Sequence, residues 1–530
     1  MRRRASLAVG AGLCVIALGL ASVACSNRAG DCALNAEKQR PDGTCVEGIG
    51  TGGAKPACSG DPTAKNVIDA CGVFAQSDAT GTTEDGTQAH PYKTLQKALD
   101  SAGTKRVYAC ASAPFVEAVT IAASVEMYGG FDCAKGWAWS QDKRSTLNGP
   151  ANTVALTLAK GADGAKVEGF SITGASPSVM TSGGSSIAVA VDDVTATLER
   201  CDVKASDAAD GSDGQKPPGA ATQGAAALIG AMGATNACFA AAVGGPPGMT
   251  TCDDGMTSGG VGGAGGVTGT NSGDGQNGAD GQPADATKGK GGTGADANND
   301  CNDATKGKSG TAGSAGPGGS APGLLTLSGI TSTDSTDGLP GTKAQGGGGG
   351  GGAKSGTFCM AGAMTVDGVG ASGGGGGGGG CGGKGGGGGR AGGSSIAIVS
   401  LGTKLVLTDV ALAVGKGGKG GGGVTGQIGG LPGVGANGGA SSGTPPSKAG
   451  CKGGDGGTGG DGGPGGGGRG GHSIGVAYAK GPTTAPTVKT FMPGTPGNGG
   501  TAGTGAPVTS TGAKGAAAQC WDFGSNAACK

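Results

Sequence analysis

This sequence contains few aromatic residues and only two histidines, and it has no net charge. Only 3% of the residues are aromatic, which argues against broad stacking surfaces for sugars or bases. Lys plus Arg and Asp plus Glu both number 38, so no net field favours nucleic acid or anionic lipid as a partner. The only histidines are His90 and His472 and no C-x-x-C pair occurs, which disfavours a zinc site.

Apolar residues are also few. They make up 35% of the 530 residues, against 129 glycines, so we expect one elongated core with long excursions rather than several packed cores. No segment beyond the N-terminal leader is long and apolar enough to span a bilayer. No G-x-S-x-G, P-loop, H-E-x-x-H or dinucleotide fingerprint stands in its required context, so the sequence predicts no cofactor.

A repeated stretch organises the rest of the chain. Residues 183–205 recur at 392–414 and, more briefly, at 470–478. Within each run the apolar period is two, which is typical of a strand, and the phase slips by one between runs, so the chain must turn a corner. This pattern predicts coils of a right-handed parallel β-helix. The matched apolar pairs are Ile187 with Ile396, Val189 with Ile398, Leu198 with Leu407, Cys201 with Val410, and Val203 with Leu412.

The first residues read as a secretory leader. Residues 1–24 contain an arginine run, an apolar stretch and small residues before Cys25, as a signal peptide does. The sequence Ser22-Val23-Ala24-Cys25 resembles a bacterial lipobox, which implies that Cys25 is lipidated and that the protein is anchored at the outer membrane or cell surface. Ordinary cleavage after Ala24 is the alternative, and the protein would then be secreted.

The chain divides by composition into further segments. Residues 25–66 read as a polar tether, and residues 67–205 as β-helix with an N-terminal cap. Apolar residues at helical spacing predict a helix of two to three turns within Thr87–Gly103, which would cover the open end of the coil. Strands are expected at 106–110, 125–128, 154–158 and 167–172. The remaining predicted segments are glycine-rich excursions at 206–391 with a coil fragment near 323–330, a coil at 392–414, an excursion at 415–469, a coil at 470–492 and a glycine-rich C-terminal segment at 493–530.

The glycine-rich excursions allow two interpretations. Disorder is one, because glycine loses the most backbone entropy on ordering and little apolar surface compensates. Period three suggests the other, since Asp455, Thr458, Asp461 and Pro464 are each separated by two glycines. A polyglycine II bundle has three residues per turn, and its glycine edges let neighbouring helices approach closely.

Cysteine spacing suggests local disulfides in an oxidising compartment. Of the 17 cysteines, fifteen follow the lipobox. Cys201 stands at an inward strand position and is expected to be a buried free thiol, with pairing as the alternative. The closely spaced candidates are Cys58 with Cys71, Cys110 with Cys133, Cys359 with Cys381, and Cys520 with Cys529.

A family resemblance rests on the N-terminal half. The run DGTQAHPYKTLQKAL at 85–99, followed by RVYAC and VEGFSITG, resembles the opening segment of pectin-lyase-like parallel β-helices. With the GGSSIA copies and the glycine tracts, the whole chain resembles the glycine-rich PGRS-like surface lipoproteins typical of myxobacteria. The resemblance implies a fold and a location, and it carries no catalytic residue.

Residues with possible site chemistry each have a structural alternative. Asp192 and Asp193 are an acidic pair, but a corner of the coil also favours Asp. Trp137 and Trp139 offer sugar stacking or packing over the early coils, and His472 replaces a serine of the other copies. Two acidic groups suit either calcium or a solvated loop. They are Asn299, Asp300, Asn302 and Asp303, and Asp253 with Asp254.

The sequence therefore favours a non-enzymatic surface lipoprotein with a structural or adhesive role. Its expected partners are the membrane, through the lipid anchor, and polysaccharide or other surface proteins, but not nucleic acid. The alternatives are a carbohydrate-active, pectin-lyase-like enzyme or polysaccharide-binding module, and a calcium-dependent binding module.

Overall fold

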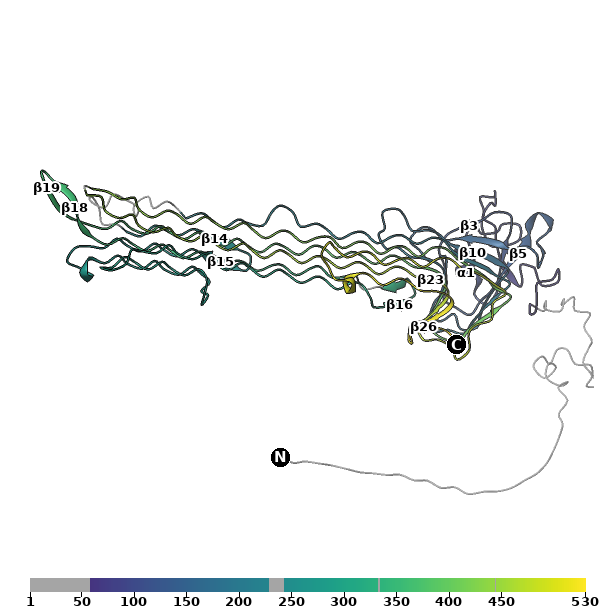
Figure 1. Cartoon of the computed structure of the whole chain (residues 1–530). Coiled ribbons are helices and arrows are strands. Elements are labelled where there is room, and N and C mark those ends of the chain that lie inside the picture. Colours follow the sequence, from purple (N-terminus) through teal and green to yellow (C-terminus); the bar gives the residue numbers. More distant parts are fainter. Residues whose placement is uncertain (1–57, 228–242, 332–333, 444) are drawn as a thin grey trace, which may run out of the picture. The chain divides into compact units, whose positions relative to one another are not determined.

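The computed structural model describes residues 58–227, 243–331, 334–443 and 445–530, within one unit that begins at Ala57. The described part is mostly β, and three sheets built largely from parallel strands carry most of its strands (Figure 1). No helix in the described ranges has the length and hydropathy needed to cross a bilayer. The predicted signal peptide and the predicted lipidation site Cys25 lie outside the described residues.

The three sheets each combine strands from distant parts of the chain. Sheet 1 contains, in spatial order, β1 (Gly72–Ala75), β2 (Arg106–Cys110), β5 (Glu126–Asp132), β9 (Ala165–Glu168), β12 (Ala196–Glu199) and β21 (Leu405–Thr408), with β6 (Ala138–Trp139) beside β5. Sheet 2 contains β24 (Thr490–Met492), β22 (Ala411–Val414), β13 (Asp202–Ala205), β10 (Phe170–Gly174), β7 (Ser145–Asn148) and β3 (Phe115–Val116). Sheet 3 contains β26 (Ala527–Ala528), β25 (Ala517–Asp522), β23 (Ser473–Tyr478), β20 (Ser395–Ser400), β11 (Ser186–Val191), β8 (Leu156–Leu158) and β4 (Val119–Ile121).

The chain visits these sheets in rotation. From β8 to β13 it passes through sheets 3, 1 and 2 twice, and β20, β21 and β22 repeat the same order. Within the three sheets every pairing is parallel except the short antiparallel contacts of β6 with β5 and β26 with β25. The repeated stretch therefore supplies one strand to each sheet, as its phase slips predict.

Strand register confirms the ungapped alignment of the two repeat copies. Ile187 pairs with Ile396, Leu198 with Leu407 and Val203 with Leu412, and Val189 pairs with Ile398. Cys201 and Val410 are both fully buried in the same core.

Left-handed residues mark the corner between sheets 1 and 2. Arg200 and Asp409 have φ of 48° and 53°, and Gly169 at the same corner of an earlier coil has φ of 76°. The strand predicted over 167–172 is therefore two strands, β9 and β10, separated by this corner.

Two apolar clusters bury the strands of sheet 3 on both faces. The main core takes Val189, Val191 and Ile398 from them. Ile187 and Ile396 instead belong to a second cluster on the outer face of the sheet. All six residues of β11 are buried because other segments cover that outer face.

The coil fragment predicted near 323–330 is wrong. β16 (Leu324–Thr326) and β17 (Gly329–Thr331) pair antiparallel as a hairpin. The hydroxyl of Thr326 donates to the carbonyl of Gly329 at 2.8 Å, and Gly329 has φ of 115°, which a β-branched or bulky residue would not adopt without strain. The hairpin packs Leu325 onto the second cluster, so its apolar residues cover sheet 3 rather than extend it.

The predicted helix is present but shorter than the segment expected to hold it. Helix α1 (Leu95–Ala102) begins after Thr94, whose hydroxyl accepts from the Lys97 amide at 3.3 Å, and ends at Gly103 with φ of 58°. Its buried face consists of Leu95, Ala98 and Ala102. The tether predicted over 25–66 ends earlier than expected, because the Cys58–Cys71 disulfide and the buried Asn66 fasten its last residues to the sheets.

The glycine-rich excursions are ordered in the described ranges. The described residues within 206–394, 415–472 and 493–516, together called the glycine bundle, run as extended segments side by side (Figure 1). Gly374, Gly377, Gly380, Gly383, Gly386 and Gly389 donate to the carbonyls of Cys451, Gly454, Gly457, Gly460, Gly463 and Gly466 at 2.9–3.0 Å. A bond at every third residue is the pattern that polyglycine II helices produce and that disorder does not.

Successive glycines in the central segments face three different neighbours. A Cβ on Gly347, Gly348 or Gly349 would overlap the carbonyl oxygens of Gly454, Lys290 and Val261, respectively. Segments of the G-G-x type have neighbours on two sides, and the third residue faces outward, as Asp461 does. The number of glycines per turn therefore reports the number of sides on which a segment is packed.

Smaller elements interrupt the bundle. Two hairpins were not expected from the sequence, β14 (Met249–Cys252) with β15 (Gly255–Ser258), and β18 (Gly356–Ala361) with β19 (Met364–Gly368). Short 3-10 turns occupy Cys133–Lys135, Asn271–Gly273 and Val508–Ser510. The C-terminal segment at 493–530 is more than a glycine tract, because β25 continues sheet 3.

Candidate functional site

Charged side chains follow the outer face of sheet 1 from strand to strand. Outward positions on successive parallel strands lie above one another, so charges placed there form a row. We call this row the charged ladder. Its members are Arg106, Glu126, Lys166, Glu168, Glu199 and Arg200.

Ion pairs connect four members of the ladder into a network and join the other two, Arg106 and Glu126, as a separate pair. Lys166 Nζ lies 2.7 Å from Glu168 Oε2 and 2.8 Å from Glu199 Oε2. Arg200 Nη2 lies 2.7 Å from Glu168 Oε1. Arg106 Nε lies 2.6 Å from Glu126 Oε2. Three cations therefore match three carboxylates, and each oxygen of the Glu168 side chain, which is only 2% exposed, lies 2.7 Å from a cation.

Tyr128 lies within the ladder. The Arg106 guanidinium and the Lys166 ammonium lie 5.0 and 5.4 Å from the centre of its ring. Burial raises the pKa of the Tyr128 hydroxyl well above its ordinary value. Burial alone would lower the pKa of Lys166, but its hydrogen bonds to Glu168 and Glu199 raise it overall. Tyr128 is therefore neutral and Lys166 charged at neutral pH, which suits a network that holds strands together.

The acidic pair predicted at the repeat corner has turn chemistry. Asp192 Oδ1 accepts from the Asp193 amide at 2.8 Å, and Asp193 Oδ1 lies 3.3 Å from Lys404 Nζ. The pair is thus occupied by its own corner and by the next coil. The structure brings no third acidic residue to it, since no group of three or more His, Cys, Asp or Glu within metal-binding reach occurs in the described ranges.

The calcium candidates serve the glycine bundle. Asp254 and Asp303 accept from the backbone amides of Lys343 and Lys452 at 2.8 and 2.7 Å. The other carboxylates face lysines, Asp253 with Lys384 at 3.9 Å and Asp300 with Lys448. Asn302 Nδ2 donates to the Thr293 hydroxyl at 2.8 Å, and Asn299 bonds to Asp296. The structure does not gather these residues into one site.

Both tryptophans have packing roles. Trp137 is buried and its ring lies 4.7 Å from that of Phe74. Trp139 is half-buried, donates through Nε1 to the Gly129 carbonyl at 3.1 Å and lies under the Arg200 guanidinium at 4.8 Å. Both residues also line a cavity of about 510 Å³ together with Gln88 and Lys135, so packing does not cover this part of the surface completely.

His472 is fully buried at the start of β23. Its Nδ1 accepts from the Ala516 amide at 3.1 Å, and its ring lies 5.5 Å from the ring of Phe523. Burial, with a smaller effect of Arg469, lowers the pKa of His472 to about 4. A neutral imidazole that fixes the last coil accounts for this residue without a catalytic role.

Disulfides staple both the sheets and the bundle. Cys58–Cys71, Cys110–Cys133 and Cys520–Cys529 are bonded as the spacing suggests. The pairing of Cys359 with Cys381 is wrong. Cys381 is bonded to Cys252, and Cys301 to Cys451, because the bundle brings segments 129 and 150 residues apart side by side; Cys359 is itself disulfide-bonded. Cys201 is a buried free thiol, and burial raises its pKa to about 11.

A row of carboxylates caps backbone amides of the bundle, and the sequence analysis did not predict it. Asp207, Asp210 and Asp213 accept from the amides of Lys416, Lys419 and Gly422 at 2.6–2.7 Å. Both sets advance by three residues, so the D-x-x-D-x-x-D spacing was the available signal. Side-chain caps of this kind satisfy backbone groups at the edges of a bundle.

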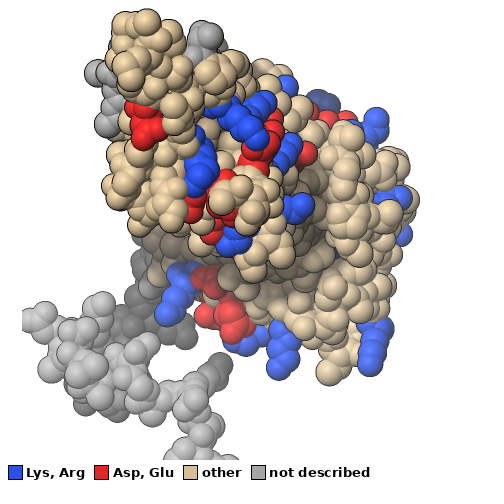
Figure 2. All heavy atoms as spheres, turned by 60° about the vertical axis from the view of Figure 1, so that its left-hand side comes forward, with Lys and Arg blue, Asp and Glu red and all other residues tan. Residues whose placement is uncertain are grey.

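One face of the molecule is mostly uncharged (Figure 2). On the face that Figure 2 shows, lysine and arginine lie beside aspartate and glutamate, and most of the surface belongs to other residues. Comparison with known proteins gives no further lead, because no family model, no curated protein and no solved structure matches this chain.

Proposed function

We propose that this chain is a non-enzymatic lipoprotein of the bacterial cell surface, with a structural or adhesive role at the envelope. The observation that supports this most directly is the glycine bundle, whose segments are hydrogen-bonded at every third residue. Ordered, extended and largely uncharged segments suit a rigid spacer that displays surface away from its base. Many weak backbone and side-chain contacts along such a spacer suit multivalent attachment.

The base of this spacer is, in our proposal, a right-handed parallel β-helix whose faces are sheets 1, 2 and 3. The rotation of the chain through three parallel sheets around one apolar core supports it. The handedness follows the general preference of parallel crossover connections. A lipid on Cys25 would fix this base to the outer membrane.

Mass spectrometry of the mature N-terminus tests the proposed lipid anchor and localisation. A diacylglyceryl-modified and acylated Cys25 is expected, together with recovery in the outer-membrane fraction. Protease added to intact cells should release fragments of the glycine bundle. An unmodified Cys25 on a protein that is soluble in the periplasm would refute the proposal.

One observation favours a second function, a carbohydrate-active enzyme on the β-helix. The charged ladder places five ionisable side chains along one strand face and Arg200 at the adjoining corner, which is where grouped acid and base chemistry would stand. This function predicts the release of reducing or unsaturated ends from acidic polysaccharides, and their loss in a Lys166→Met variant. The proposed non-enzymatic role predicts no release from either protein.

A further inference from the structure

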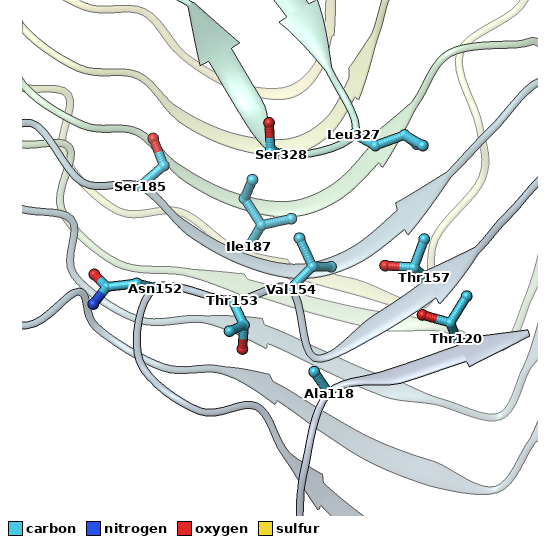
Figure 3. A pocket seen from close by; sticks show the side chains of 10 residues that line it. All are labelled: Ala118, Thr120, Asn152, Thr153, Val154, Thr157, Ser185, Ile187, Leu327 and Ser328. Carbon is cyan, nitrogen blue, oxygen red and sulfur yellow. The ribbon is translucent and has the colours of Figure 1, made fainter. Parts of the chain in front are cut away.

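A cavity lies on the outer face of sheet 3, where the sheet is not covered by the β16–β17 hairpin. It has a volume of about 370 Å³. Figure 3 shows the hairpin turn with Leu327 and Ser328 on one side and Thr120 and Thr157 on neighbouring strands on another. The remaining lining is Ala118 just before β4, Asn152, Thr153 and Val154 in the turn before β8, and Ser185 and Ile187 at the start of β11.

The lining is neutral and amphipathic. None of its ten residues is charged, six carry a hydroxyl or an amide, and Val154, Ile187 and Leu327 provide apolar contacts. A charged ligand would lose its hydration without meeting an opposite charge. A purely apolar ligand would bury hydroxyls without a hydrogen-bond partner. The pocket therefore suits a neutral ligand that carries both hydroxyl and C–H groups.

Two of the hydroxyls are available to a ligand. Asn152 bonds to Ser178, and Thr153 donates to Pro150. Ser185 accepts from the Ser394 amide, and Ser328 lies 3.1 Å from the Thr326 hydroxyl. The hydroxyls of Thr120 and Thr157 have no side-chain hydrogen bond within the part of the chain that the structure describes. These two residues are register partners on β4 and β8, so they stand side by side.

Strand addition by a peptide is blocked at this edge. β4 is the outermost strand of sheet 3, and an unpaired edge is a common docking place for extended chains. Here the amide of Thr120 donates to Gln96 Oε1 at 2.7 Å and its carbonyl accepts from Gln96 Nε2 at 3.2 Å. Helix α1 thereby occupies the backbone groups of Thr120 and leaves its hydroxyl free.

We propose that this pocket binds one or two units of a neutral saccharide. A sugar ring carries hydroxyls around its rim and C–H groups on its faces, which matches the two halves of the lining. The volume is near the lower end of the roughly 300–1,000 Å³ of small-molecule sites, which suits a mono- or disaccharide unit. The proposal rests on the adhesive role proposed above and gives it a ligand class.

Titration calorimetry with neutral gluco-, galacto-, manno- and xylo-oligosaccharides of two to four units tests this inference. At least one should bind the wild-type protein, with an affinity that does not change between low and high salt because the ligand has no charge. An acidic oligogalacturonate serves as the comparison and should bind at least tenfold more weakly. Binding of the acidic ligand alone, or of no neutral ligand, would overturn the proposal.

Variants locate the binding. The double variant Thr120→Val and Thr157→Val keeps side-chain shape and should weaken binding tenfold or more. Thr173→Val, at a half-buried outward position of β10 in sheet 2, is the matched control and should change affinity less than twofold. Ser328→Arg, at an exposed hairpin turn, should also abolish binding, and it provides the test if the double variant does not fold. Unchanged affinity in the folded variants would refute the site. The lipidation of Cys25 tests the proposed cell-surface localisation separately, so the two proposals can fail independently.

Discussion

Replacing Gly349 by alanine should loosen the glycine bundle from its centre. Gly349 is buried, and a Cβ there would lie less than 3.0 Å from the carbonyl of Val261. The neighbour is backbone, so it cannot swing aside as a side chain could. The segment that holds Val261 must then move away, and it is joined to the Gly349 segment by the bonds Gly260 to Gly347 and Gly263 to Gly350, each of 2.8 Å.

The cost follows from these contacts. Overpacking by one methyl group costs about 1–3 kcal/mol, and the two strained hydrogen bonds contribute about 1 kcal/mol each. We expect the free energy of opening of this part of the bundle to fall by about 3–5 kcal/mol. Gly422→Ala is the matched control, because a Cβ there meets only Asp213 and Thr501, at 3.3 Å or more. Its effect should be within about 1 kcal/mol and can be stabilising, since alanine restricts the unfolded chain.

Hydrogen exchange followed by mass spectrometry measures both changes. Amides of the central glycine runs should exchange slowly in the wild-type protein, and Gly349→Ala should speed exchange in peptides covering 258–264 and 345–353. Gly422→Ala should leave those peptides unchanged. Complete exchange of the wild-type runs within seconds, or equal effects of the two substitutions, would refute the packing argument.

Three further predictions concern the stability of other parts. Reduction of Cys252–Cys381, or its replacement by two serines, should destabilise the bundle by on the order of 4–5 kcal/mol in thermal or denaturant unfolding, since it closes a loop of 129 residues. Lowering the pH from 6.5 to 4 should cost about 3 kcal/mol, because His472 has its pKa lowered to about 4 in the folded state and binds a proton more readily when unfolded; His472→Ser should remove this loss. Glu168→Gln should cost about 3 kcal/mol in denaturant titration, because it leaves the mostly buried Arg200 without a carboxylate partner and Lys166 with Glu199 alone, while the more exposed Glu126→Gln should cost less than about 1 kcal/mol.

Strand register could be predicted from the sequence because the repeat copies align without a gap. The pairing of Leu198 with Leu407 needs only a shared period and a shared corner, and both are visible in the residues. The outward placement of Ile187 could not be predicted. It depends on the β16–β17 hairpin, which lies far along the chain and whose apolar residues mimic the phase slip of a coil.

Disulfide pairing in the bundle could not be predicted from spacing. Local spacing works for Cys58 and Cys71 because a short loop closes at low entropic cost. It fails for Cys381, whose segment lies beside that of Cys252 only once the extended segments are packed. Glycine count per turn was the missing signal, since uninterrupted glycine runs mark central segments and runs of the G-G-x type mark the rim.

The position of the excursions along the coil explains why they pack together at all. Each leaves from a strand of sheet 2 and returns to a strand of sheet 3, from β13 to β20, β22 to β23 and β24 to β25. Successive coils are stacked about 4.8 Å apart, so the outgoing segments begin side by side at that spacing. Gly211 and Gly214 then donate to the segment of the next coil, and Gly417 and Gly420 to the one after it, at every third residue. Strands of a sheet keep this spacing with any side chain, but only glycine lets a chain keep it toward neighbours on several sides at once. The glycine content of the excursions therefore follows from their packing together beyond the corner at which they are inserted.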